Sequence, residues 1–148
     1  MTRLVLDASV AVKWYLHEDH SADARAVLDG RTEFSVPDFF YAEVANVFWK
    51  RVRRKEITSA RAAILFGMLS EVPIEIHETK PLTAGALDLA AASGVTVYDH
   101  LYLCLALREG LPLVTADRVF YDAVDAGEHH RSIVWVADAP SLLSRREQ

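Results

Sequence analysis

The chain has 148 residues, 51% of them hydrophobic and 25% charged, so it can fold as one domain around a core of its own. A formal net charge of −5 argues against nucleic-acid binding over the whole surface, although it is compatible with a local basic track. Asp7 and Lys13 interrupt the apolar start, and no stretch approaches the roughly 20 residues of a membrane span, so we expect no signal peptide or membrane anchor. The single Cys104 cannot form an internal disulfide, which fits a reducing cytoplasm.

Short apolar runs alternate with patterns of helical period along the whole chain. The expected elements are, in order, a strand at 4–6, a helix at 8–16, a small helix at 21–29, a strand at 34–36, a helix at 38–55, a helix from 58 or 59 to 69, a strand at 74–76, a helix at 82–93, a helix from 99 to 109, a strand at 111–115, a short helix around 119–124, a strand at 133–136 and an Arg-rich tail. Strands separated by helices predict an α/β fold: one domain over residues 1–148, with a central, mostly parallel sheet flanked by helices.

Aspartates stand where predicted elements meet. Asp7 follows the first strand and Asp117 follows the fourth, and in a parallel sheet the carboxyl ends of the strands share one rim. Asp99 is expected to be the N-cap of its apolar helix. If the first and fourth strands are neighbours, these acids lie close together. The simpler alternative is that all three merely cap helices, a role that contributes about 1 kcal/mol each.

A fourth acid interrupts an apolar helical stripe. Phe40, Val44, Val47 and Phe48 are spaced as one face of a helix, and Glu43 lies beside that face. A carboxylate is costly to bury without a partner. Glu43 is therefore either an ordinary glutamate at the margin of the stripe or a side chain with a specific partner.

Four carboxylates at one place require a counter-charge. Two like charges about 4 Å apart repel by roughly 4 kcal/mol at an effective dielectric constant near 20. Ligands that are all oxygen favour Mg²⁺ or Mn²⁺, ions that activate water and bind phosphates. If the acids meet, the chemistry that suits them is phosphodiester hydrolysis.

The chain resembles the PIN-domain family, and specifically the VapC-like toxins of bacterial toxin–antitoxin pairs. The segments that carry the resemblance are LVLDAS (4–9), PDFFYAEVANVF (37–48), YDHLYLCLAL (98–107) and TADRVF (115–120). The resemblance implies an endoribonuclease dependent on Mg²⁺ or Mn²⁺. The residues that match its acidic quartet are Asp7, Glu43, Asp99 and Asp117. Ser9 and Thr115 match polar positions that support the metal ligands, whereas His100 stands where the family usually has a small residue.

The resemblance also implies partners. VapC-like toxins usually dimerise, and a VapB-like antitoxin holds them inactive by laying a C-terminal segment, often with an Arg or Lys, across the acidic cleft. We therefore expect a homodimer, a cognate antitoxin and an RNA substrate. A cation from the antitoxin would suit a cluster of carboxylates by replacing or excluding the metal ion.

A basic cluster at the end of the Glu43 helix bears on RNA independently of the resemblance. Its residues are Lys50, Arg51, Arg53, Arg54 and Lys55. Lys50 and Arg54 follow Glu43 by seven and eleven residues, which places them on its side of the helix, roughly 10 and 16 Å along the axis. That spacing suits phosphates that flank a scissile bond. The alternative is a solvated helix end whose cations complement the helix dipole.

Several other functions fit the sequence less well than a nuclease does. A haloacid-dehalogenase-like phosphatase would need a second aspartate where Ser9 stands, and a receiver domain would need a phospho-accepting aspartate after a central strand. A non-catalytic module on the same scaffold would bind an antitoxin or RNA without cutting it. The aromatic residues indicate core or dimer contacts, and His129 and His130 indicate a surface loop. Asp38 and Asp122 are either accessory ligands or surface residues.

Overall fold

The structure is a computed structural model that describes residues 2–146. Its centre is a five-stranded parallel sheet in the order β3-β2-β1-β4-β5. The strands are β1 (Thr2–Leu6), β2 (Thr32–Pro37), β3 (Ile74–His77), β4 (Leu113–Thr115) and β5 (Ile133–Trp135). All five predicted strands are confirmed, with ends that differ by up to two residues from the expected ones.

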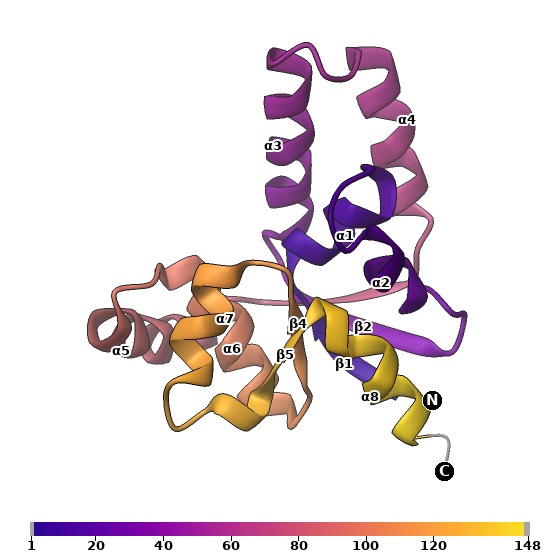
Figure 1. The fold of residues 1–148 in the computed structure, drawn as a ribbon. Coiled ribbons are helices and arrows are strands. Elements are labelled where there is room, and N and C mark those ends of the chain that lie inside the picture. The colour runs from indigo at the N-terminus through magenta and orange to yellow at the C-terminus, as the bar shows by residue number, and fades with distance from the viewer. Residues whose placement is uncertain (1, 147–148) are drawn as a thin grey trace.

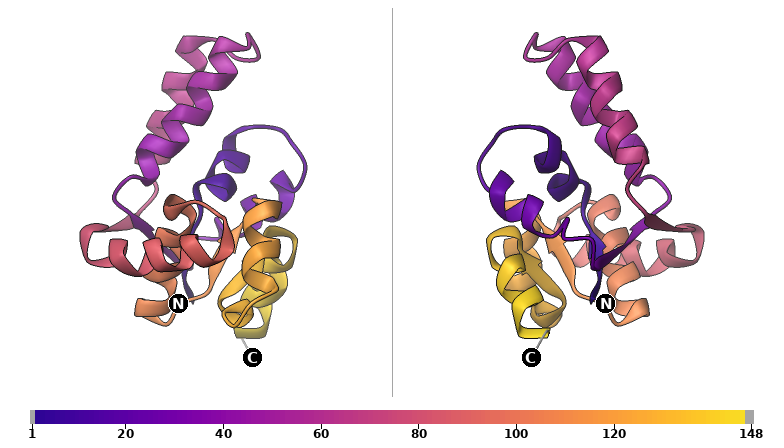
Figure 2. Two further views of the ribbon diagram at one scale, coloured as in Figure 1. Left: turned by 90° about the vertical axis from the view of Figure 1, so that its left-hand side faces the viewer. Right: turned by 90° about the vertical axis from the view of Figure 1, so that its right-hand side faces the viewer.

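Helices cover both faces of this sheet. Within residues 2–146 they are α1 (Ala8–Tyr15), α2 (Ser21–Ala26), α3 (Phe40–Arg53), α4 (Ser59–Ser70), α5 (Thr83–Ser93), α6 (Val97–Glu109), α7 (Arg118–Asp125) and α8 (Ala139–Arg146). Figure 2 shows α1 and α2 on one side of the sheet and α5 on the other, while α6 packs against β1 and β2. The α/β architecture expected from the sequence is thus confirmed.

The sheet positions a site at its centre. The first crossover carries the chain from β1 to β2, whereas β4 pairs with the other edge of β1. The strand order therefore reverses between β1 and β4, and ligands of open α/β sheets bind at the carboxyl ends of strands at such a point. Leu4, Val5 and Leu6 of β1 are fully buried, so the strand that leads to this point is rigidly packed.

Helices α3 and α4 form an arm, residues 40–70, that projects from the sheet as an antiparallel pair (Figures 1 and 2). The apolar stripe predicted for α3 anchors it: Phe40, Val44 and Phe48 are buried, and Val47 is half-buried. The Arg-rich tail, for which no element was predicted, forms α8, and α8 packs against α2. No helix among residues 2–146 is long and apolar enough to span a membrane.

Candidate active site

Asp7 stands at the point where the strand order reverses. It directly follows β1, is only 4% exposed, and its backbone N–H donates to the carbonyl oxygen of Val114 in β4 at 3.1 Å. Its Oδ2 accepts hydrogen bonds from Ser9 Oγ at 2.6 Å and from Thr115 Oγ1 at 2.7 Å. Two hydroxyl donors thus fix one oxygen of a buried carboxylate.

Ser9 and Thr115 join the ends of β1 and β4. Ser9 Oγ accepts from the Ala116 backbone N–H, and Thr115 Oγ1 accepts from the Asp117 backbone N–H, each at 3.0 Å. Each hydroxyl group therefore accepts a hydrogen bond from a backbone N–H of the segment after β4 and donates one to Asp7. The structure brings these two predicted polar residues to Asp7, although their catalytic contribution stays a prediction.

Asp117 is the N-cap of α7. One of its oxygens, Oδ1, accepts from the Phe120 backbone N–H at 3.2 Å, as the capping interpretation predicts. The backbone N–H of the same residue donates to the Thr115 hydroxyl, which in turn donates to Asp7. Asp117 can therefore cap α7 and still belong to the cluster of acids.

The prediction that Asp99 caps its helix is wrong. Helix α6 begins at Val97, and the N-cap is Thr96, whose Oγ1 accepts from the Asp99 backbone N–H at 3.3 Å. Asp99 lies in the first turn, where the helix dipole favours a negative charge. Because the threonine hydroxyl caps the helix, the half-buried Asp99 carboxylate is not used as a cap.

Glu43 has a specific partner, which is the second of the two alternatives that the sequence left open. It is half-buried in the first turn of α3, and Glu43 Oε1 accepts a hydrogen bond from the Tyr102 hydroxyl at 2.8 Å. Tyr102 belongs to α6, the helix that also carries Asp99. Nothing in the sequence patterns indicated Tyr102, because it lies in an apolar run that is typical of a buried helix.

The four acids are electrostatic neighbours. Burial, followed by the charges of Asp7 and Asp99, raises the pKa of Glu43 to about 7, although the Tyr102 hydrogen bond opposes the rise. Burial, followed by the charges of Asp7 and Asp117, raises the pKa of Asp99 to about 6. Burial also raises the pKa of Asp7, against the hydrogen bonds from Ser9 and Thr115. Asp7 and Asp117, Asp99 and Asp7, Asp99 and Asp117, and Glu43 with Asp7 and Asp99 therefore lie within electrostatic range of one another, whereas their joint role as a site stays a prediction.

The carboxylates do not form a ready-made ligand cage. Among residues 2–146, no three His, Cys, Asp or Glu side chains are arranged as ligands around one point. Mg²⁺ keeps several of its waters and often binds only one or two carboxylates directly, so a looser cluster of acids still suits it. The oxygen-only donor set and the mutual repulsion of the acids fit a hard divalent cation.

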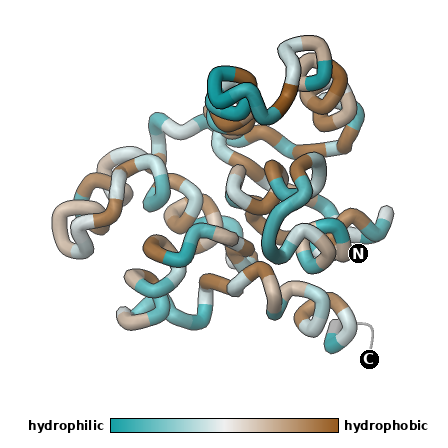
Figure 3. Tube along the Cα trace, turned by 45° about the horizontal axis from the view of Figure 1, so that its top comes forward, coloured by the Kyte–Doolittle hydropathy of each residue, from teal (hydrophilic) through white to brown (hydrophobic). Residues whose placement is uncertain are grey.

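The basic residues of the arm divide into paired and exposed ones. Arg51 bonds to Glu18 at 2.5 Å and to Glu56 at 3.0 Å, and Arg53 stacks over the Trp49 ring. Lys50 and Arg54 are exposed. Figure 3 shows this far end of α3 as hydrophilic.

The remaining candidates have contacts of their own. Asp38 Oδ2 accepts from the Thr79 backbone N–H at 3.4 Å, and Asp122 pairs with Arg118 at 3.3 Å. His100 is buried, and its Nε2 lies 2.6 Å from Ser93 Oγ of α5. The residue that departs from the family pattern is therefore packed into the protein.

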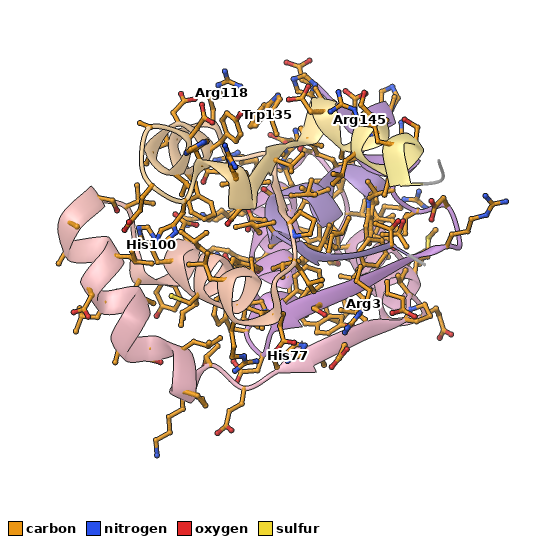
Figure 4. The ribbon with its side chains drawn as sticks, turned by 90° about the horizontal axis from the view of Figure 1, so that it is seen from below. Arg3, His77, His100, Arg118, Trp135 and Arg145 are labelled. Carbon is orange, nitrogen blue, oxygen red and sulfur yellow. The ribbon has the colours of Figure 1, made fainter. Side chains whose placement is uncertain are left out.

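Residues at the β5 edge of the sheet also make contacts of their own. His129 pairs with Glu128, as expected of a surface loop. Figure 4 shows Arg118 beside Trp135, whose ring lies 4.7 Å below the guanidinium carbon. Trp135 ends β5, and its contact with Arg118 was not predicted from the sequence.

Comparison with known proteins decides the family. The sequence model of the PIN domain matches residues 4–126. This chain belongs to the PIN-domain family. Ribonuclease VapC3 of Pyrobaculum aerophilum is 34% identical to it over 118 residues, which cover 78% of this chain and 90% of the relative. Ribonuclease VapC12 of Mycobacterium tuberculosis is 32% identical over 114 residues, which cover 77% of this chain and 86% of the relative.

Solved structures show the same PIN fold. The crystal structure of PAE2754 from Pyrobaculum aerophilum has a TM-score of 0.71 and 24% identity, and the match covers 99% of this chain and 91% of that one. Mycobacterium tuberculosis VapC20, described as a toxin that cleaves the sarcin–ricin loop, has a TM-score of 0.64 and 11% identity. That match covers 81% of this chain and 94% of VapC20.

Proposed function

We propose that this PIN-domain protein is the endoribonuclease toxin of a VapBC-type toxin–antitoxin pair. The observation that carries the proposal is the gathering of four acids around the reversal of strand order: burial and neighbouring carboxylates raise the pKa values of Asp7, Glu43 and Asp99, and the charge of Asp117 contributes to the rise at Asp7 and Asp99. Relatives of at least 32% identity named as VapC ribonucleases support RNA as the substrate.

We propose Mg²⁺ or Mn²⁺ as the cofactor, held by carboxylates of this quartet. Once bound, such an ion supplies an activated water and positive charge for the phosphodiester. The protein's own part is to hold Asp7 through the Ser9 and Thr115 hydroxyls and to keep the acids in a partly buried, preorganised cluster. The proposed catalytic residues are Asp7, Glu43, Asp99 and Asp117, with Ser9 and Thr115 in support.

A cleavage assay tests this proposal. Purified protein, free of antitoxin, is incubated with total RNA in the presence and absence of Mn²⁺, and the cut ends are mapped. We expect defined cut sites only with the metal ion, and none from the Asp99→Asn variant. Binding of RNA without any cut, under conditions in which the protein is folded and loaded with Mn²⁺, would favour the non-catalytic module instead.

We propose that Lys50 and Arg54 contact RNA phosphates that flank the scissile bond, roughly 10 and 16 Å along the helix axis from Glu43. Their exposure on the Glu43 helix supports this, because Arg51 of the same cluster is already paired with acids. Each lost phosphate contact lowers the salt slope of single-strand binding by about 0.7. We expect Lys50→Ala and Arg54→Ala each to flatten the slope by about that amount.

Arg131→Ala is the matched control for these two variants. Arg131 is exposed and precedes β5, at the amino ends of the strands, away from the acid rim. Its loss should leave the salt slope of RNA binding at the wild-type value. A slope that is unchanged in Lys50→Ala and Arg54→Ala as well would eliminate the proposed track.

We also propose a VapB-like antitoxin and a second copy of this chain as partners. Large apolar side chains are exposed on the arm, where Trp49, Ile64 and Met68 are each more than half exposed. Such patches mark protein–protein contacts on soluble domains. Similar folds occur in a Klebsiella pneumoniae toxin–antitoxin complex and in Rickettsia felis VapBC2 bound to promoter DNA. An antitoxin cation set among the acids would compete with the metal ion.

A further inference from the structure

Among residues 2–146, Tyr102 is the one aromatic side chain that bonds to a member of the acid quartet. It follows Asp99 by three residues in α6, so the two side chains share a face of that helix. The Tyr102 ring is fully buried, and its hydroxyl donates to Glu43 Oε1 at 2.8 Å. A buried phenol needs a hydrogen-bond partner, and here that partner is a proposed metal-binding carboxylate.

The ring of Tyr102 is held from a second side. Phe39, the N-cap residue of α3, meets it edge-on, with ring centroids 5.5 Å apart and planes at 86°. The phenol therefore spans from α6 to the base of the arm. A tyrosine has few rotatable bonds, so little conformational entropy is lost when its ring is fixed in this way. A glutamate side chain has more rotamers to lose, so a fixed tyrosine is a suitable partner to hold it.

Tyr102 is the donor in its bond with Glu43, because an ionised carboxylate can only accept. In metalloproteins, hydrogen bonds of this kind fix the orientation of ligating carboxylates, and their loss lowers metal affinity or activity by about 10- to 100-fold.

We propose that Tyr102 is a positioning residue that holds the Glu43 carboxylate in the acid cluster and so sets the affinity for the divalent cation. The inference rests on the proposed function, because it assumes that the cluster binds such an ion. It assigns Tyr102 no contact with RNA and no part in proton transfer. Its effect passes entirely through Glu43.

Calorimetric titration of the metal-free protein with Mn²⁺ tests the proposal without any cleavage assay. We expect Tyr102→Phe, which removes only the hydroxyl, to weaken Mn²⁺ binding about 10-fold or more. Tyr98→Phe is the matched control, because Tyr98 also lies in α6 and also meets Phe39 edge-on but is 63% exposed. It should bind Mn²⁺ as the wild type does. Thermal unfolding of both variants shows whether the fold is retained.

A double-mutant cycle with Glu43→Gln assigns the route of the effect. If Tyr102 acts through Glu43, adding Tyr102→Phe to Glu43→Gln should not weaken Mn²⁺ binding further. An equal loss in both backgrounds, or wild-type affinity in Tyr102→Phe, would overturn the proposal and leave the nuclease assignment standing. Phe39→Leu, which keeps both bonding partners but removes the edge-on ring, is a second variant and should show a smaller loss that also disappears in Glu43→Gln.

The same titration separates failure of this inference from failure of the proposed function. If Asp7→Asn and Glu43→Gln both leave Mn²⁺ binding at the wild-type level, the acid cluster is not the metal site, and both proposals are wrong. If these two variants weaken binding and Tyr102→Phe does not, only the role of Tyr102 is wrong.

Discussion

Asp7→Asn is expected to lower the rate of RNA cleavage at saturating Mn²⁺ by about a thousandfold or more while the fold is retained. The asparagine oxygen can still accept from Ser9 Oγ and Thr115 Oγ1, so the link between the ends of β1 and β4 persists. What disappears is the negative charge at the centre of the cluster. Because burial raises the pKa of Asp7, the neutral amide should not destabilise the metal-free protein.

Cleavage of total RNA and thermal unfolding are measured on the same preparation of each variant. The matched control is Asp38→Asn, because Asp38 directly follows β2 at the same rim of the sheet but is exposed. We expect this control to cut RNA at the wild-type rate. Full activity in Asp7→Asn would refute the catalytic role assigned to Asp7. Loss of activity in both variants would indicate that the active site includes the end of β2.

The proximity of Asp7 and Asp117 could be predicted because it depends on local patterns. Each acid follows a short apolar run, and parallel strands place such ends at one rim. The step that the sequence did not supply is that β4 pairs directly with β1. Strand order depends on how the helices pack over the sheet, and no local pattern in this chain encodes it.

The wrong prediction at Asp99 overlooked a capping signal that is present in the sequence. Thr96 precedes Asp99 by three residues, which is the spacing of a capping box with threonine as N-cap and an acid in the first turn. The apolar run from Leu101 suggested a later start. The threonine hydroxyl competes better for the cap, and α6 therefore begins two residues before Asp99.

Tyr102 could not be predicted as part of the site from the patterns used. Its partner Glu43 lies 59 residues earlier, on a different helix, and Tyr102 itself stands among leucines. Periodicity left open whether Glu43 has a partner and did not indicate which residue that partner would be. The contact depends on how the first turn of α3 is placed beside α6, which is a property of the packed fold. The same holds for α8, which packs against α2.

The metal-free protein is expected to lose stability as pH rises from 5 to 8, and Mn²⁺ should reverse this loss. The pKa of Glu43 rises from 4.5 to about 7 and that of Asp99 from 3.8 to about 6, so the folded chain binds more protons than the unfolded chain between these values. Stability therefore falls as pH rises through this window. The penalty is absent below the unfolded pKa values and complete above about pH 7.

Mn²⁺ binds the ionised carboxylates, so its stabilising effect should appear only at the upper end of this range. At pH 8, a concentration about 100 times the dissociation constant stabilises the fold by about 2.7 kcal/mol, which raises the melting temperature by about 5–10 °C. At pH 5 the same concentration should change it far less, because protons occupy the site. Glu43→Gln removes one of the three carboxyl groups whose pKa is raised, so the pH dependence of the metal-free variant should be flatter. A melting temperature that Mn²⁺ leaves unchanged at pH 8 would contradict a metal site at these four acids.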